Sequence, residues 1–140
     1  MCEIDFLCED IDLPQLDFDF LRNCIADIVT HNNRKCGSIS VVFCSDDYIL
    51  DVNRRYLNHD YYTDIITFDY NEGDIVSGDL VISLDTVRSN SKEFGTSYKQ
   101  ELHRVVFHGV LHLVGFGDKT DAEVQNMRGL EEFWLTKFSV

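Results

Sequence analysis

Two histidines four positions apart, followed by a carboxylate, are the residues of this sequence best suited to chemistry. They lie in the segment HGVLHLVGFGD, residues 108–118. On a helix, residues i and i+4 share one face, so His108 and His112 can direct two imidazole nitrogens at one ion. Gly115 can end that helix and let Asp118 turn back toward the same point. Three ligands with one open coordination position are typical of a catalytic rather than a structural zinc site.

Gly109 follows the first histidine directly. A glycine in the middle of a helix costs roughly 1 kcal/mol relative to alanine, so it predicts a close approach by another element or by a substrate. The helix-borne zinc proteases carry HExxH, with a glutamate general base at this position. The spacing His-x3-His-x5-Asp otherwise matches the extended protease pattern. Because Gly109 replaces that base, peptide hydrolysis is disfavoured. Two histidines at this spacing are also compatible with ordinary half-buried side chains that bind no metal.

The composition indicates a globular protein. The chain has 140 residues, 44% hydrophobic and 12% aromatic, with one proline and no low-complexity linker, which predicts a single domain over residues 1–140. No apolar run approaches the ~20 residues of a membrane helix, and the acidic N-terminal segment lacks the basic stretch of a signal peptide. We therefore expect a cytoplasmic protein with no membrane partner. All five cysteines, Cys2, Cys8, Cys24, Cys36 and Cys44, are then expected to be reduced thiols.

The formal net charge of -13 disfavours a protein that coats nucleic acid through bulk electrostatics. Basic residues nevertheless gather in two stretches, within 34–55 and 88–104. They can form a local basic groove or a scatter of solvated charges, and charge alone does not separate these alternatives.

Hydrophobic periodicity predicts an α/β (α+β) fold with a small mixed four-stranded sheet covered by helices, in the order β-α-β-α-β-β-α-α. The strands are expected at 3–8, 38–44, 64–70 and 79–85, and the helices after 14, after 45, over 97–114 and after 120. The turn residues at 71–74 indicate that the third and fourth strands are antiparallel. In the final helix we expect these side chains to face the core: Val124, Met127, Leu130, Phe133 and Trp134.

Several segments together resemble one known family, the YbeY-type bacterial rRNA maturation endoribonucleases. HGVLHLVGF is similar to the family core HGxLHLxG followed by Tyr or Phe. The segments 53–56 (NRRY), 63–68 (TDIITF) and 78–83 (GDLVIS) are similar to the family's N-R-x-Y, T-D-V-L-S-F and G-D-I-x-I-S. Glu123 and Met127 match the acidic residue and the methionine that follow the metal loop. The resemblance runs from about residue 40 to the end of the chain.

This resemblance implies a zinc-dependent endoribonuclease that prefers single-stranded RNA, trims the 3′ end of small-subunit ribosomal RNA and helps to remove defective ribosomes. The implied partners are ribosomal RNA and the small ribosomal subunit. By position, one Zn²⁺ per chain would be held by His108, His112 and the residue at 118. Three alternatives stay open: a metallopeptidase-like hydrolase, a non-haem iron enzyme with a two-histidine, one-carboxylate triad, and a non-catalytic ribosome assembly factor whose metal stabilises the fold.

Two positions depart from the family pattern. Asp118 stands where relatives usually carry a third histidine; a carboxylate can replace imidazole on zinc, but its negative charge makes the ion a weaker Lewis acid. Leu57 stands where relatives usually carry an arginine able to steady a phosphate. Arg54, Arg55 or His59 can compensate, or can be exposed charges at a helix end.

Two acidic residues, Asp64 and Asp79, match family positions in the third and fourth expected strands. Each can orient a ligand imidazole or simply cap the end of a strand. The sequence leaves this choice open, and it does not identify the attacking group.

Overall fold

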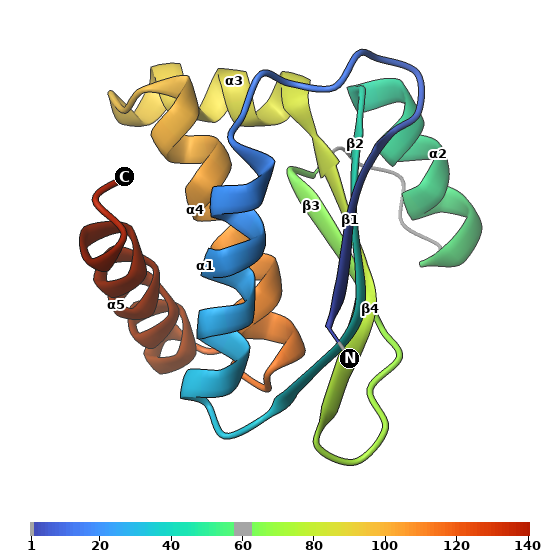
Figure 1. Ribbon diagram of the computed structural model, residues 1–140. Helices are drawn as coiled ribbons and strands as arrows, with labels where there is room; N and C mark the ends of the chain where they lie inside the picture. The colour runs from blue at the N-terminus through green and yellow to red at the C-terminus, as the bar shows by residue number, and fades with distance from the viewer. Residues whose placement is uncertain (1, 58–62) are drawn as a thin grey trace.

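A mixed β-sheet with helices on both faces forms the architecture of the chain, whose computed structural model describes residues 2–57 and 63–140 (Figure 1). The elements in chain order are β1 (Glu3–Cys8), α1 (Phe18–His31), β2 (Lys35–Cys44), α2 (Asp46–Tyr56), β3 (Ile65–Asp69), β4 (Ile75–Ser83), α3 (Leu84–Phe94), α4 (Tyr98–Leu113) and α5 (Asp121–Lys137). None of the helices described is both long and apolar enough to cross a membrane.

The strands lie in the order β1-β2-β4-β3. β1, β2 and β4 are mutually parallel, and β3 pairs with β4 in the antiparallel direction, as the turn residues predicted. β3 therefore forms one edge of the sheet. The predicted fold class and order of elements are confirmed, with one addition. Helix α3 begins directly after β4, where the Ser83 side chain accepts a hydrogen bond from the Thr86 amide, whereas the predicted strand ran on to residue 85.

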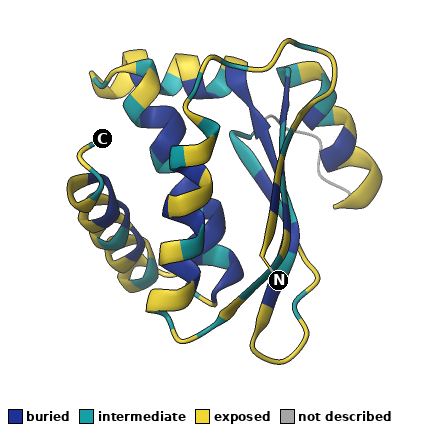
Figure 2. Ribbon diagram, in the orientation of Figure 1, coloured by how far each residue is buried: buried dark blue, intermediate teal, exposed yellow. Residues whose placement is uncertain are grey.

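Helix α4 is the most deeply buried helix on its side of the sheet (Figure 2). Its apolar side chains share one core cluster with α1 and with Leu80 and Ile82 of β4. Val81, which points to the other face of the same strand, belongs to a second cluster with α2. Burying each large apolar side chain contributes roughly 1.5–3 kcal/mol, so α4 is firmly held against the sheet.

At Gly109, α4 packs closely against side chains of the sheet. A Cβ atom at this position would lie 2.7 Å from Ile65 Cδ1 and 2.9 Å from Leu80 Cδ2. The close approach that the sequence predicted is therefore made by the sheet. Because α4 packs so closely, the two histidines on either side of this turn of helix lie beside the edge strand β3.

The core face of α5 differs from the prediction at two positions. Val124 is 39% exposed and Phe133 is 49% exposed. The buried residues are Met127, Glu131, Trp134 and Leu135. Phe133 lies at the border between α5 and α1, where its ring is 6.2 Å from that of His31. Val124 lies near the N-terminal end of α5 and borders a cleft.

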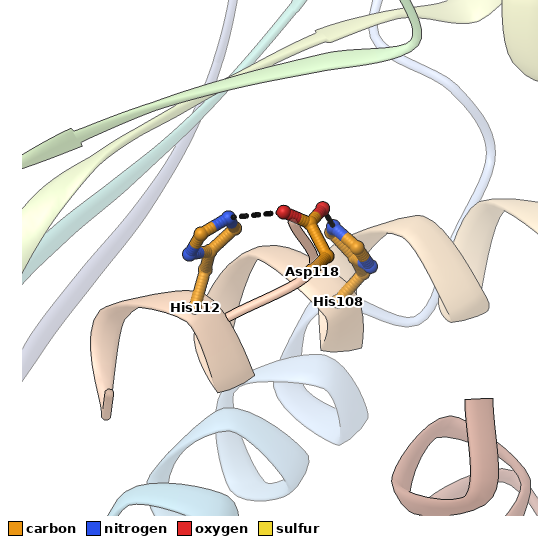
Figure 3. Close-up of side chains that lie close together, drawn as sticks. All are labelled: His108, His112 and Asp118. Carbon is orange, nitrogen blue, oxygen red and sulfur yellow. Dashed lines mark ion pairs between the residues drawn. The ribbon is translucent and has the colours of Figure 1, made fainter. Parts of the chain in front are cut away.

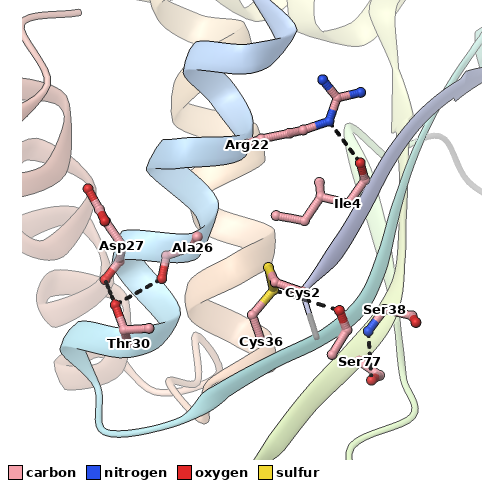
Figure 4. Close-up of a disulfide and its surroundings, with 10 residues drawn as sticks. Cys2, Ile4, Arg22, Ala26, Asp27, Thr30, Cys36, Ser38 and Ser77 are labelled. Carbon is pink, nitrogen blue, oxygen red and sulfur yellow. Dashed lines mark hydrogen bonds between the residues drawn. A yellow bond between two sulfur atoms is a disulfide. The ribbon is translucent and has the colours of Figure 1, made fainter.

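The expectation that all five cysteines are reduced thiols is wrong for one pair. Cys2, the residue before β1, and Cys36 of β2 form a disulfide (Figure 4). Parallel pairing of β1 with β2 brings the two Cα atoms to 4.8 Å, a proximity that residues 34 positions apart do not reveal. Cys8, Cys24 and Cys44 are free. Burial, together with nearby acidic side chains, raises the pKa of Cys24 and of Cys44 to about 12, so both are unreactive thiols.

Two glycine substitutions test the packing of α4. Gly129 lies in α5, and nothing lies within 4 Å of the point that a Cβ atom would occupy there. Gly129→Ala should therefore raise the free energy of unfolding by about 1 kcal/mol through helix propensity alone. Gly109→Ala gains the same propensity but displaces Ile65 and Leu80, and overpacking of this kind costs roughly 1–3 kcal/mol. We expect it to be neutral or destabilising in denaturant titrations. Equal stabilisation by both variants would contradict the close packing.

Candidate metal centre

The end of α4 brings the chain back over its own histidines. The last helical residue is Leu113, and Gly115 has a φ of 116°, a left-handed conformation that favours glycine. The Gly115 amide donates to the His112 carbonyl oxygen at 3.1 Å, and the Phe116 amide donates to the Leu111 carbonyl oxygen at 3.0 Å. The following loop therefore runs back along α4 and carries Asp118 to the histidine face.

Three predicted ligands converge at this point (Figure 3). The Asp118 carboxylate lies between two imidazoles, with Oδ2 at 3.2 Å from His108 Nε2 and Oδ1 at 3.4 Å from His112 Nε2. One ligand atom from each of the three residues lies within 4.8 Å of the others. The His108 side chain is 21% exposed, and the His112 side chain is 34% exposed. The cluster is thus anchored in the protein but reachable from solvent.

A buried carboxylate orients the first imidazole. His108 Nδ1 lies 2.7 Å from Glu131 Oε2, and the Glu131 side chain is only 7% exposed. A carboxylate accepts hydrogen bonds, so Nδ1 carries the proton and Nε2 presents its lone pair to the cluster. Burial lowers the pKa of His108, but the Glu131 hydrogen bond and the charges of Glu131, Asp64 and Asp118 outweigh it and raise the pKa overall. Negative charge thus gathers where a cation would sit.

Arg104 holds Glu131 from the opposite side. Its Nη1 lies 3.2 Å from Glu131 Oε1, its Nε lies 3.4 Å from Glu101 Oε1, and its Nη2 pairs with Glu132. The Arg104 side chain is 16% exposed. Glu131 was not among the residues predicted from the sequence. The sequence does hint at this role, because Glu131 is a carboxylate on the same face of α5 as the apolar residues Met127 and Trp134.

Asp64 lies at the candidate centre, and Asp79 does not. Asp64 immediately precedes β3 and borders a groove of about 390 Å³ together with all three predicted ligands. Burial raises its pKa, while His108 and the backbone amides of Asp64 and Ile65 oppose the rise. Asp79 instead accepts a hydrogen bond from the Tyr70 hydroxyl at 3.2 Å. Its neighbour Leu80 points to α4, so strand alternation turns Asp79 to the other face of the sheet.

Helix α2 contributes Asn53 and Leu57 to the same groove. Leu57, the C-terminal cap of α2, is 41% exposed. Arg54 and Arg55 are exposed on α2, where Arg55 Nε lies 3.1 Å from Asp51 Oδ2. Among the residues that the structure describes, neither arginine lines the groove. His59, the remaining candidate, lies outside the described residues.

Comparison with known proteins identifies the family. The family model described as Endoribonuclease YbeY matches residues 7–139. The chain belongs to the YbeY family. Endoribonuclease YbeY of Parabacteroides distasonis is 52% identical, over 89% of this chain and 87% of that protein. Endoribonuclease YbeY of Phocaeicola vulgatus is 48% identical, over 98% of this chain and 99% of that protein.

A solved structure shares the fold. The solution structure of a Thermotoga maritima protein is 27% identical, has a TM-score of 0.64, and covers 97% of this chain and 91% of its own. The resemblance predicted from the motifs around residues 53–83 and 108–116 is thereby confirmed at the level of the YbeY family. Leu57 and Asp118, the two positions at which the sequence departs from the motifs it resembles, lie at the groove and in the cluster of ligands.

Removing the carboxylate behind His108 should weaken metal binding. Glu131→Gln leaves the side-chain volume almost unchanged but cannot present acceptor oxygens to both His108 and Arg104. We expect zinc affinity to fall roughly ten- to a hundredfold, the usual effect of losing a group that orients a ligand. Competition with a chromophoric chelator measures this loss. Glu132→Gln is the matched control, because Glu132 also pairs with Arg104 but its side chain is 62% exposed. Equal losses in both variants would mean that the orientation of His108 is not the cause.

Proposed function

We propose that this chain is a metal-dependent endoribonuclease that cuts single-stranded RNA in the cytoplasm and holds one Zn²⁺ through His108, His112 and Asp118. The substrate we propose is ribosomal RNA at the 3′ end of the small-subunit species, with the small ribosomal subunit as partner and ribosome quality control as a related role. The observation that carries this proposal is the convergence of the three side chains within 4.8 Å in a chain of the YbeY family.

The donor set fits zinc. Two imidazole nitrogens and one carboxylate oxygen are ligands that catalytic zinc sites use, with a further position left for water or substrate. A bound zinc ion would supply an activated water molecule and would polarise a phosphoryl oxygen. Glu131 keeps His108 Nε2 available to the ion. The loop after Gly115 supplies Asp118, which borders the groove, so a bound ion would be reachable by a substrate lying there.

The packing of Gly109 supports an RNA substrate over a peptide. A side chain at this position would point at Ile65 and Leu80, so a glutamate here would collide with the sheet. The residue after the first histidine therefore cannot act as the general base that the HExxH proteases place there. The relatives named above carry the name endoribonuclease, which supports the same choice.

Most side chains that line the groove are uncharged, so electrostatic attraction alone would not position a substrate there. It is lined on one side by Asn53 and Leu57 of α2, and on the other by Thr67 of the edge strand and by Lys119. With few cations set against a net charge of -13, RNA binding should be weak and strongly salt-dependent. We propose that contacts within the ribosomal subunit supply the remaining affinity.

Metal analysis and RNA cleavage together test this function. Purified protein should contain about one zinc per chain and cleave single-stranded RNA until a chelator is added, while leaving casein intact. His108→Ala and His112→Ala should lose most of the zinc and the activity, Asp118→Ala should weaken zinc retention, and Asp118→His should restore it. His31→Ala, on α1, is the control that should change neither. Protein that stays metal-free in neutral zinc solution, or casein hydrolysis that disappears in His108→Ala, would refute the proposal.

The residue at the end of α2 should limit the rate. An arginine can hold a phosphate by charge-assisted hydrogen bonds that Leu57 cannot make. One such bond is worth on the order of 1.5–3 kcal/mol, so Leu57→Arg should speed cleavage of protein-free RNA roughly ten- to a hundredfold. Arg54→Ala and Arg55→Ala test whether either arginine already binds the phosphate, because the variant that removes such an arginine should lose activity and keep its zinc. Zinc content is measured in every variant. An unchanged rate in a zinc-loaded Leu57→Arg protein, with both alanine variants silent, would exclude phosphate binding from this helix.

A further inference from the structure

A second hollow, the α3–α4–α5 cleft, opens from the same cluster of ligands. It has a volume of about 570 Å³ and shares Asp64, His108 and Asp118 with the groove. Away from this shared end, it is bordered by Phe94, Thr96, Glu101 and Arg128, among others. The volume falls within the ~300–1,000 Å³ typical of small-molecule sites. The candidate metal centre thus lies where two hollows meet.

Three helices line this cleft. Asn90 and Phe94 share one face of α3, Glu101 and His108 share one face of α4, and Arg128 belongs to α5. Along α4, the seven helical steps from Glu101 to His108 span about 10 Å. The cleft therefore continues away from the candidate metal centre for about two helical turns, in the direction that a strand held at the centre could follow.

The walls of the cleft include apolar surface that the protein leaves uncovered. Phe94 is 53% exposed and Val124 is 39% exposed, although both lie beside a cleft. An exposed aromatic ring next to a nuclease centre is the type of surface on which unstacked bases pack. Because the cleft is continuous with the candidate centre, a strand whose phosphate lies at the metal ligands can place a flanking base here.

Two polar atoms at the cleft make no hydrogen bond within the protein. They are Thr96 Oγ1 and Glu101 Oε1, both almost fully covered by the protein, and Glu101 Oε1 forms an ion pair with Arg104 Nε at 3.4 Å. Four carboxylates, Asp64, Glu101, Asp118 and Glu131, border the cleft against two arginines, Arg104 and Arg128. Arg104 is already paired with three glutamates. Asp64 and Asp118 belong to the end shared with the metal ligands, and at the other end Glu101 and Glu131 balance Arg104 and Arg128, so that end is close to neutral and suits a neutral base.

We propose that the α3–α4–α5 cleft binds a nucleobase of the RNA strand flanking the scissile phosphate, with Phe94 as the surface on which that base stacks. The proposal rests on the endoribonuclease function proposed above. It adds a base-binding subsite and implies that cleavage depends on an intact base at one fixed distance from the cut. The groove along β3 and α2 then receives the strand on the other side of the metal ligands.

Kinetics of the zinc-loaded protein on single-stranded RNA test the subsite. Phe94→Ala should raise KM by roughly five- to a hundredfold, the range expected for the loss of one stacked base, with little change in kcat. Phe94→Trp should keep KM near the wild-type value, because a larger ring retains the stacking surface. Phe133→Ala is the matched control: Phe133 is similarly exposed, at 49%, but lies beside His31 of α1 and does not line the cleft. Zinc content and melting temperature are measured for all four proteins.

A second measurement separates stacking from a structural effect. RNA substrates carry a single abasic nucleotide at successive positions on either side of the cut. Wild-type protein should lose affinity at one position, and Phe94→Ala should be insensitive to the missing base at that same position. If wild type cleaves RNA but Phe94→Ala has the KM of Phe133→Ala, or keeps the wild-type abasic profile, the base subsite is refuted while the nuclease function stands. If wild type binds zinc but does not cleave RNA, both proposals fail.

Discussion

At Gly109, α4 lies close enough to the sheet that a single Cβ atom would meet Ile65 and Leu80 at less than 3 Å. This contact fixes how close α4, which carries both histidines, lies to the sheet. It places His108 and His112 beside the edge strand, next to Asp64, and it aligns α4 so that the returning loop carries Asp118 over both imidazoles. The same contact leaves no room for a general base at position 109. One packing constraint thus affects both where the two histidines lie and whether a side chain fits at position 109.

The candidate centre is surrounded by carboxylates, which favour binding of a cation. Asp64, Asp118 and Glu131 all act on His108, and Asp64 itself is buried enough for its pKa to be raised. Concentrating carboxylates in this way is unfavourable unless positive charge is supplied. Arg104 balances the inner part of the cluster, where it pairs with three glutamates, but it lies behind His108 rather than at the open side. A divalent ion at the three ligand atoms would balance the outer part.

The two departures from the family pattern act in the same direction. A carboxylate in place of a third imidazole lowers the positive charge felt by a substrate at the metal, and Leu57 in place of an arginine removes a cation from the groove. A chain with a net charge of -13 has little to offset these losses. Under the proposed function, affinity for RNA would then come from contacts with unstacked bases and from the ribosomal surroundings. Phe94, an exposed aromatic ring in a cleft continuous with the centre, is placed where it could make such a base contact.

Local patterns in the sequence determined much of this protein. Alternation and helical periodicity predicted the strands and all helices but α3, the capping residues Ser97 and Thr120 began α4 and α5, and the i, i+4 spacing put two histidines on one face. These features depend on neighbours within a few residues, so they can be read along the chain. Tertiary structure alone decided that Glu131 lies behind His108, that Asp79 faces away from the centre, that Cys2 meets Cys36, and that Val124 and Phe94 border a cleft. Each of these depends on how separate elements pack, because pairing between strands and the contact of α5 with α4 bring together residues far apart in sequence.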